Sequence, residues 1–364
     1  MRKIFVGAIL AVLLCGSAGA DVVYTTDAGT LGLIKISSST SADLVGTQYT
    51  GTGSDSLLGS YWNGSETRVL VINRDSTTAS GDVALTFSPS NLTTPLKSSG
   101  DILAGVHNAR SMAGSNTGRS VFFASGNRIS EFRTDDFSAV RSYDYTPGGS
   151  IKAVISTASR IYAIAEDEAS GDVILGFDGQ LKEDVQDFVK ASAPEGTAAL
   201  SWLSGSRAAV GHASGVSLWS SNIFTLLVSS DAPVKSLCMD DEGGFYFAEQ
   251  SSSGDVYTTT LKHYSGGEVS STLFTSTDGR GCKVFRHDSE SVLAAVIGSN
   301  LRLYSMKDDA LIASYDASTL GGNPLSVAAS SVSGDDGSSG SSGCELSGLG
   351  VILLAGCAVI MKRR

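Results

Sequence analysis

Four basic residues stand at one repeated position of the chain, where each one precedes or opens a short apolar segment. They are Arg110, Lys152, Lys235 and Lys283. Cations that recur at one position of a repeating unit would meet around a common axis and attract a ligand with a carboxylate, phosphate or sulfate group. The alternative is that these long side chains cover apolar surface and keep their charged ends in solvent.

Acids and one histidine lie in the predicted loops on the same side of the units, among them His212, Glu166 and Glu249. His212 and Glu249 could contact a ligand held by the cations, or they could be solvated turn residues. Carboxylates and a histidine could also act as general acid and base on a sugar or a lactone. An extracellular lyase, hydrolase or lactonase-like enzyme is therefore the alternative to a binding protein.

Other motifs for chemistry are not found in the sequence. The four histidines have no metal-ligand spacing, and the chain has neither a nucleophile elbow nor a phosphate-binding loop. The acidic stretch 240–244 could hold calcium, but its position favours a tight turn on the opposite face. We expect no metal, no cofactor and no assignable catalytic residue.

Two cysteines, Cys238 and Cys282, fall in neighbouring units. Their positions relative to the aligned cations differ by four residues, or roughly 13 Å along a strand, which exceeds the ~7 Å that a disulfide can bridge between Cα atoms. We predict two unpaired thiols.

A β-rich repeat would position all these residues. Seven apolar triplets, one per unit, begin at Val22, Val69, Val121, Ile161, Ala208, Phe245 and Val292, at intervals of 37 to 52 residues. A period near 45 residues with four strands per unit is typical of a β-propeller blade.

The two ends of the repeat region complement each other. Six triplets follow a first strand, whereas the triplet at Val22 has none, and the matching segment Leu325-Ser326-Val327-Ala328 occurs at the far end. Pairing of the two would close the ring and remove its exposed sheet edges. We predict an all-β, seven-bladed β-propeller over residues 21–329, closed by its C-terminal strand, with six or eight blades or a pair of β-sandwiches as alternatives.

This pattern resembles the seven-bladed propellers of the YncE and YVTN type, without Trp-Asp pairs at the blade ends. The resemblance covers residues 21 to about 329 and implies a binding surface where loops meet at the mouth of the channel. It does not identify a ligand.

The N-terminus has the features of a secretory signal. Arg2 and Lys3 precede an apolar segment over 4–14, and Ala18-Gly19-Ala20 forms a small-residue cleavage site. We predict a signal peptide over 1–20 that signal peptidase cuts after Ala20.

The C-terminus has a tripartite order. A Ser/Gly/Asp-rich linker, 330–343, meets Cys344, an apolar run over 346–361 and three terminal cations. As a helix, the run would be about 24 Å long, slightly short for a membrane span, with the cations on the cytoplasmic side. A plain membrane anchor would explain this order.

The segment 344–364 also resembles CTERM sorting signals, most closely the Synergist-CTERM type with its Ser-Gly-Cys motif; the MYXO-CTERM type shares the Gly-Cys pair. That resemblance implies cleavage at or near Gly343 and Cys344 by an intramembrane sorting protease, with possible lipid attachment to the cysteine and display on the cell surface.

Charge excludes some partners. The predicted signal and tail hold five of the 26 basic and one of the 37 acidic residues. The part of the chain that lies between these two segments therefore has 21 basic and 36 acidic residues, a net charge of −15. Such a surface repels nucleic acid and anionic lipid. We therefore expect an exported, monomeric, non-enzymatic binding module for an anionic small molecule, glycan or protein. It would reside at the cell surface or outer membrane after transient anchoring in the inner membrane.

Overall fold

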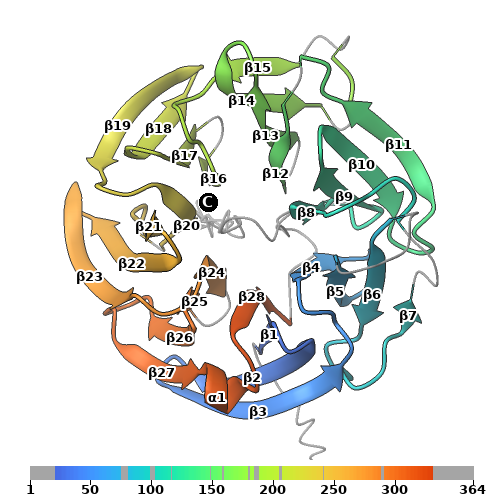
Figure 1. Ribbon diagram of the computed structural model, residues 1–364, viewed down its shortest axis with the longest axis vertical. Helices are drawn as coiled ribbons and strands as arrows, with labels where there is room; N and C mark the ends of the chain where they lie inside the picture. The colour runs from blue at the N-terminus through green and yellow to red at the C-terminus, as the bar shows by residue number, and fades with distance from the viewer. Residues whose placement is uncertain are drawn as a thin grey trace, which may run out of the picture.

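Seven four-stranded antiparallel sheets surround a common axis in the computed structural model (Figure 1). It describes residues 21–330 except 75–80, 99–102, 116, 148, 158–159, 179–180, 184–187, 205–206, 241 and 288–290. The prediction of an all-β, seven-bladed propeller is confirmed. The predicted signal peptide with Ala20 and the predicted sorting signal with Gly343 and Cys344 lie outside the described residues. Within those residues no helix is long and apolar enough to cross a membrane.

Each blade runs from an inner to an outer strand. Blade 1 contains β28 (Pro324–Ala329), β1 (Val22–Thr26), β2 (Thr30–Ser38) and β3 (Ser41–Thr50). Blade 2 contains β4 (Ser56–Trp62), β5 (Thr67–Asn73), β6 (Val83–Phe87) and β7 (Lys97–Ser98). Blade 3 contains β8 (Ser111–Gly114), β9 (Ser120–Ser125), β10 (Arg128–Arg133) and β11 (Ala139–Asp144). Blade 4 contains β12 (Ile151–Ser156), β13 (Ile161–Asp167), β14 (Gly171–Phe177) and β15 (Val189–Ser192).

The remaining blades follow the same order. Blade 5 contains β16 (Ala199–Ser204), β17 (Arg207–His212), β18 (Gly215–Ser220) and β19 (Ile223–Ser229). Blade 6 contains β20 (Val234–Met239), β21 (Phe245–Ser253), β22 (Val256–Ser265) and β23 (Glu268–Ser276). Blade 7 contains β24 (Gly281–His287), β25 (Val292–Gly298), β26 (Asn300–Ser305) and β27 (Leu311–Asp316). A single helical turn, α1 (Ala317–Leu320), joins β27 to β28.

The burial of each strand follows its place in the blade. All seven predicted triplets lie in the second strands, which pack between neighbouring blades; every residue of β25, for example, is buried. The outer strands face solvent on one side, so in β27 exposed and half-buried residues mix. A continuous apolar run therefore marks an interior strand, and mixed polarity marks the perimeter.

The ring closes as the sequence predicted. β28 pairs antiparallel with β1, with Val22 opposite Ala329 and Tyr24 opposite Val327. The Ser60 hydroxyl of blade 2 donates a hydrogen bond of 2.6 Å to the Ala329 carbonyl. The last strand, β28, is thus bonded to β1, the second strand of its own blade, and to β4, the inner strand of blade 2.

Buried serines join the inner strands at other blade boundaries. Ser111 Oγ accepts from the Val154 backbone N–H and donates to the Val154 carbonyl, both at 3.1 Å. Ser236 Oγ accepts from the Val284 N–H at 3.0 Å. These short side chains satisfy backbone groups that the blade sheets leave unpaired, which would be costly if buried without a partner.

A histidine between two carboxylates joins blades 6 and 7. His263 Nε2 lies 3.0 Å from Asp240 Oδ2, and Nδ1 lies 2.9 Å from Asp309 Oδ2. Asp240 also accepts from the Gly244 backbone N–H at 2.7 Å, so the acidic stretch forms the expected tight turn. The Tyr246 hydroxyl donates to Asp309 Oδ1 at 2.8 Å.

The pKa values of this cluster favour its ionised form. Burial opposes the charge of His263, but the hydrogen bonds to Asp240 and Asp309 outweigh it and raise the pKa of His263. Burial likewise opposes the charges of the two aspartates, but the hydrogen bonds that they accept, first from His263, lower the pKa of each. The cluster is therefore a buried ion pair network between blades.

The closure strand should be essential for stability. Val327 is 5% exposed opposite Tyr24, so Val327→Asp would bury an unpaired charge and lower the free energy of unfolding by about 3 kcal/mol or more. Urea denaturation measures this. Val140→Asp on the outer strand β11, where Val140 is 44% exposed, is the control and should change stability little. Equal losses in both variants would contradict the role given to closure.

The histidine cluster should make stability depend on pH. Because the folded pKa of His263 is raised, its stabilisation is complete below its unfolded pKa of about 6.5 and is lost as the pH rises through the folded value. From about pH 5 to about pH 8, the wild-type chain should lose stability relative to His263→Gln. The aspartates contribute in the opposite direction, below about pH 4. Parallel pH profiles of urea midpoints for the two chains would refute this coupling.

Candidate anion-binding site

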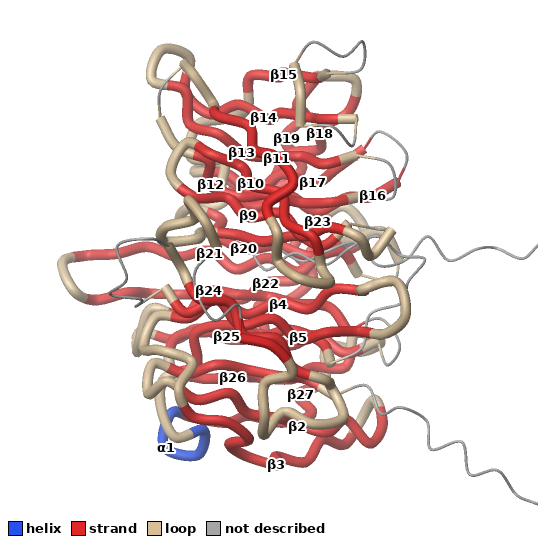
Figure 2. The backbone as a smooth tube through the Cα atoms, turned by 90° about the vertical axis from the view of Figure 1, so that its right-hand side faces the viewer, coloured by secondary structure: helices blue, strands red, loops and turns tan. Residues whose placement is uncertain are grey.

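The loops that enter the inner strands and the loops between second and third strands share one face, which we call the mouth. α1 lies on this face, and the hairpin of β21 and β22 extends outward from it (Figure 2). The hairpin is long because β21 and β22 have nine and ten residues. It forms a wall beside the inner strands of blades 6 and 7.

A pocket of about 580 Å³ opens at the mouth between blades 6, 7 and 1. We call it the basic pocket. Its lining consists of Asp27, Lys235, Gln250, Gly279, Arg280, Gly281, Cys282, Lys283, Gly298, Asn323, Pro324 and Leu325. The lining therefore combines three cations and two amides with apolar surface.

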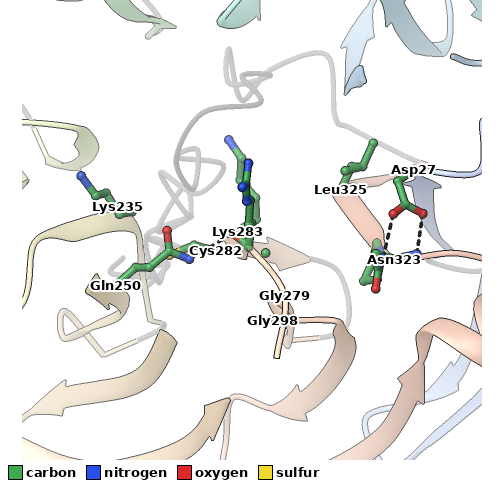
Figure 3. A pocket seen from close by; sticks show the side chains of 12 residues that line it. Asp27, Lys235, Gln250, Gly279, Cys282, Lys283, Gly298, Asn323 and Leu325 are labelled. Atoms are coloured by element: carbon green, nitrogen blue, oxygen red, sulfur yellow. Dashed lines mark hydrogen bonds between the residues drawn. The ribbon is translucent and has the colours of Figure 1, made fainter. Parts of the chain in front are cut away.

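Two of the predicted cations meet in the basic pocket. Lys235 is the second residue of β20 and Lys283 the third residue of β24, so neighbouring inner strands bring the two side chains to one side of the pocket (Figure 3). Among the described residues, Lys235 has no ion pair or hydrogen bond through its ammonium group. Two nearby cations repel each other unless an anion lies between them.

The third cation, Arg280, lies in the loop that enters β24. Its guanidinium group lies over the Tyr257 ring of the hairpin, 5.0 Å from the ring centroid, a cation–π contact that positions it at the edge of the pocket. Gln250 Nε2 donates to the Arg280 carbonyl at 3.0 Å and to Thr259 Oγ1 at 2.8 Å. The hairpin is thus bonded to the loop that carries Arg280.

One carboxylate, Asp27, lines the described part of the basic pocket. Both of its oxygens accept hydrogen bonds of 2.7 Å from Asn323, one from the backbone N–H and one from the side-chain amide (Figure 3). Asn323 immediately precedes the closure strand β28. Asp27 therefore holds the closing loop, and the lining has three positive charges against one negative charge.

The thiol in the basic pocket, Cys282, has a raised pKa. Burial raises the pKa of Cys282 to about 12, and its Sγ lies 3.7 Å from the Ala248 carbonyl. At neutral pH it is a neutral thiol, and only the thiolate is reactive. Cys282 and Cys238 are both free, which confirms the prediction of two unpaired thiols.

The other two predicted cations lie elsewhere on the mouth. Lys152 Nζ is 2.5 Å from Asp172 Oδ1. Both line a separate hollow on blade 4, the acidic hollow, together with Glu166, Asp167, Glu168 and Glu195. Arg110 Nη1 donates to Ser150 Oγ at 2.8 Å, next to this hollow. The mouth is therefore acidic over blade 4 and basic over blades 6, 7 and 1.

The predicted histidine and glutamate are engaged by other side chains of the propeller. His212 is 5% exposed, its Nε2 lies 2.9 Å from Ser217 Oγ, and burial lowers its pKa. Glu249 Oε1 lies 2.6 Å from Lys262 Nζ, and its other oxygen accepts from the Ser230 hydroxyl. Neither lines the basic pocket. With Glu166, these residues lie on three different blades, so the structure does not bring them together.

Sequence reasoning missed Arg280 and Asn323. The cations were compared at one position of the inner strands, whereas Arg280 and Asn323 stand in the loops that precede β24 and β28. Those loops were expected to form the mouth, so a basic residue in one of them was the available signal. Gln250 was expected beside Glu249 in a loop at the mouth, and in the structure it is the one of the two that lines the pocket, near the middle of the long strand β21.

Comparisons with known proteins give a fold. No family model matches the chain, and no curated protein matches it in sequence. Among solved structures, a candidate 6-phosphogluconolactonase from Bacteroides fragilis has a TM-score of 0.59 and 10% identity over 86% of this chain and 99% of its own. A second one, from Bacteroides uniformis, has a TM-score of 0.56 and 13% identity over 85% and 99%. The β-propeller domain of Cps50 (Swd1) from Myceliophteria thermophila has a TM-score of 0.50 and 13% identity over 72% and 86%. At these identities the likeness shows that the chain shares the β-propeller fold.

Proposed function

We propose that this chain is a β-propeller binding protein that takes a small anionic ligand, such as a sugar acid or a sugar phosphate, in the basic pocket. The observation that carries this proposal is the convergence of Lys235, Arg280 and Lys283 on one pocket of a chain that is otherwise rich in acids. A ligand anion would be attracted to this local concentration of positive charge. Its binding would be stronger than at an exposed site because the pocket walls exclude part of the solvent.

The polar neutral groups suit a hydroxylated ligand. Gln250 and Asn323 line the same pocket as the cations and can each donate or accept hydrogen bonds. Pro324 and Leu325 add apolar surface against which the carbon skeleton of a sugar could pack. Pockets with a few convergent polar groups on apolar walls are the usual form of small-ligand sites.

The charge of the mouth should orient the ligand as it approaches. The acidic hollow on blade 4 repels an anion, whereas the basic pocket on the far side of the mouth attracts it. The names of two structural neighbours refer to a phosphorylated sugar lactone, which belongs to the same chemical class and guides the choice of probe. The arrangement favours binding over the enzymatic alternative, because His212 and Glu249 have their partners outside the pocket.

We also propose that the propeller is exported and then processed at its C-terminus. The support is in the sequence: a basic and apolar start with Ala20 at a cleavage site, and Gly343-Cys344 before an apolar run and terminal cations. In this scheme the ligand would be met outside the cell.

Reversal of one charge in the pocket should weaken anion binding. We expect 6-phosphogluconate to bind the wild-type protein and Lys235→Glu to bind it at least about tenfold more weakly, equivalent to about 1.4 kcal/mol. Calorimetric titration measures both constants. Lys307→Glu makes the same change in the turn between β26 and β27 on the opposite face and should leave affinity unchanged. An equal loss in the control, or equal binding of uncharged glucose, would contradict the proposal.

Processing can be read from the mass of the mature protein. Purified from the cells that export it, the chain should begin at Asp21 and should end near residue 343 or 344, without the terminal cations. Cys344→Ala should retain the segment 344–364. Intact-mass spectrometry distinguishes these forms, and a wild-type chain that still ends at Arg364 would refute the sorting hypothesis.

A further inference from the structure

The outer strand of blade 5 differs from every other described outer strand. The other six each contain at least one charged residue: Asp43 in β3, Lys97 in β7, Arg141 and Asp144 in β11, Lys190 in β15, Glu268 in β23 and Asp316 in β27. β19, with the sequence IFTLLVS, contains none. Charges on edge strands prevent pairing with other chains, and β19 lacks this protection.

Large apolar side chains of β19 face solvent. Ile223 is 66% exposed and Leu226 is 55% exposed. From Ile223 to Leu226 the strand pairs regularly with Ser220 to Ser217 of β18, and the register shifts only after Leu226. On its other side, at the perimeter of the ring, β19 pairs with no described strand (Figure 1). These four residues therefore present an uncharged edge without a bulge, and alternate residues point their backbone N–H and C=O groups away from β18.

The charge of the whole chain indicates what could cover this edge. Residues 199–230, which contain blade 5, include one charged residue, Arg207, whereas the full chain has a net charge of −11. Two copies that approach through blade 4, which carries the acidic hollow, bring acidic surfaces together. Through blade 5 they meet at a surface with little charge, so less of this repulsion acts at the contact.

We propose that the outer edge of β19 is a homodimer contact, in which β19 pairs antiparallel with β19 of a second copy. Antiparallel self-pairing has two-fold symmetry, so the same uncharged edge is used by both copies. Each copy has then used its one edge, and the assembly stops at a dimer. A charged partner segment would find no opposite charge on β19. The pairing would extend two blades into one eight-stranded sheet and bury Ile223 and Leu226 of both copies. This dimer differs from the monomer that the sequence led us to expect. The basic pocket stays open in the dimer, because the pocket lies on blades 6, 7 and 1.

The oligomeric state tests this proposal. The purified full chain in detergent should have the protein mass of a dimer by light scattering and sedimentation at about 10 to 100 μM. Leu226→Lys places a charge on the edge and should weaken the dimer at least tenfold. Leu311→Lys is the matched control, since Leu311 is 50% exposed on β27 of blade 7, and it should remain dimeric.

Salt distinguishes the proposed contact from a charge-driven one. Because the edge is uncharged and the two copies are acidic, raising the salt from about 0.05 to about 0.5 M should strengthen the dimer. A cooperative urea unfolding transition in each variant would show that both remain folded. A wild-type monomer throughout this concentration range, or equal dissociation of Leu226→Lys and Leu311→Lys, would overturn the proposal.

Discussion

The antiparallel pairing of β28 with β1 is the contact on which the rest of the molecule depends. It joins the two ends of a chain segment of about three hundred residues, so the ring is complete only when the last strand has docked. The same event forms one side of the basic pocket, because Asn323 immediately precedes β28 and binds Asp27 of the β1–β2 turn. Lys235 and Lys283 contribute the opposite side from blades 6 and 7. Fold closure and the candidate site are therefore one structural feature.

Polar groups at the blade boundaries give this ring its specificity. Apolar side chains fill the space between blades, but they would tolerate small displacements of one blade against the next. Ser111, Ser236 and the cluster around His263 each bind a defined partner on the neighbouring blade. Because a buried polar group without its partner is costly, these contacts fix the register between blades. The positions of cations on neighbouring inner strands follow from that register.

The fold could be predicted almost completely from the sequence, because it depends on local patterns that repeat. Each apolar triplet marked a second strand, and the lone segment at Leu325 marked the closure, since burial on both faces demands a continuous apolar run. The site could be predicted only in part. Lys152 and Lys235 occupy equivalent positions in their blades, but Asp172 of the same blade pairs with Lys152, whereas no described acid pairs with Lys235. An ion-pair partner such as Asp172 comes from another strand and depends on where the side chains point. Alignment of the repeats gives no information about side-chain positions. His212 was expected at an open mouth but is buried beside Ser217. This contact also comes from a neighbouring strand, so alignment of the repeats could not predict it.

We propose that closure of the ring creates a pocket for an anion between blades 6, 7 and 1. The most direct measurement is a crystal structure of the protein grown with 6-phosphogluconate. Our account predicts ligand density in the basic pocket, with a phosphate or carboxylate oxygen within hydrogen-bond distance of Lys235 Nζ or Lys283 Nζ and a second contact from Arg280. Density for the ligand in the acidic hollow on blade 4, or an ordered basic pocket without ligand at saturating concentration, would contradict it.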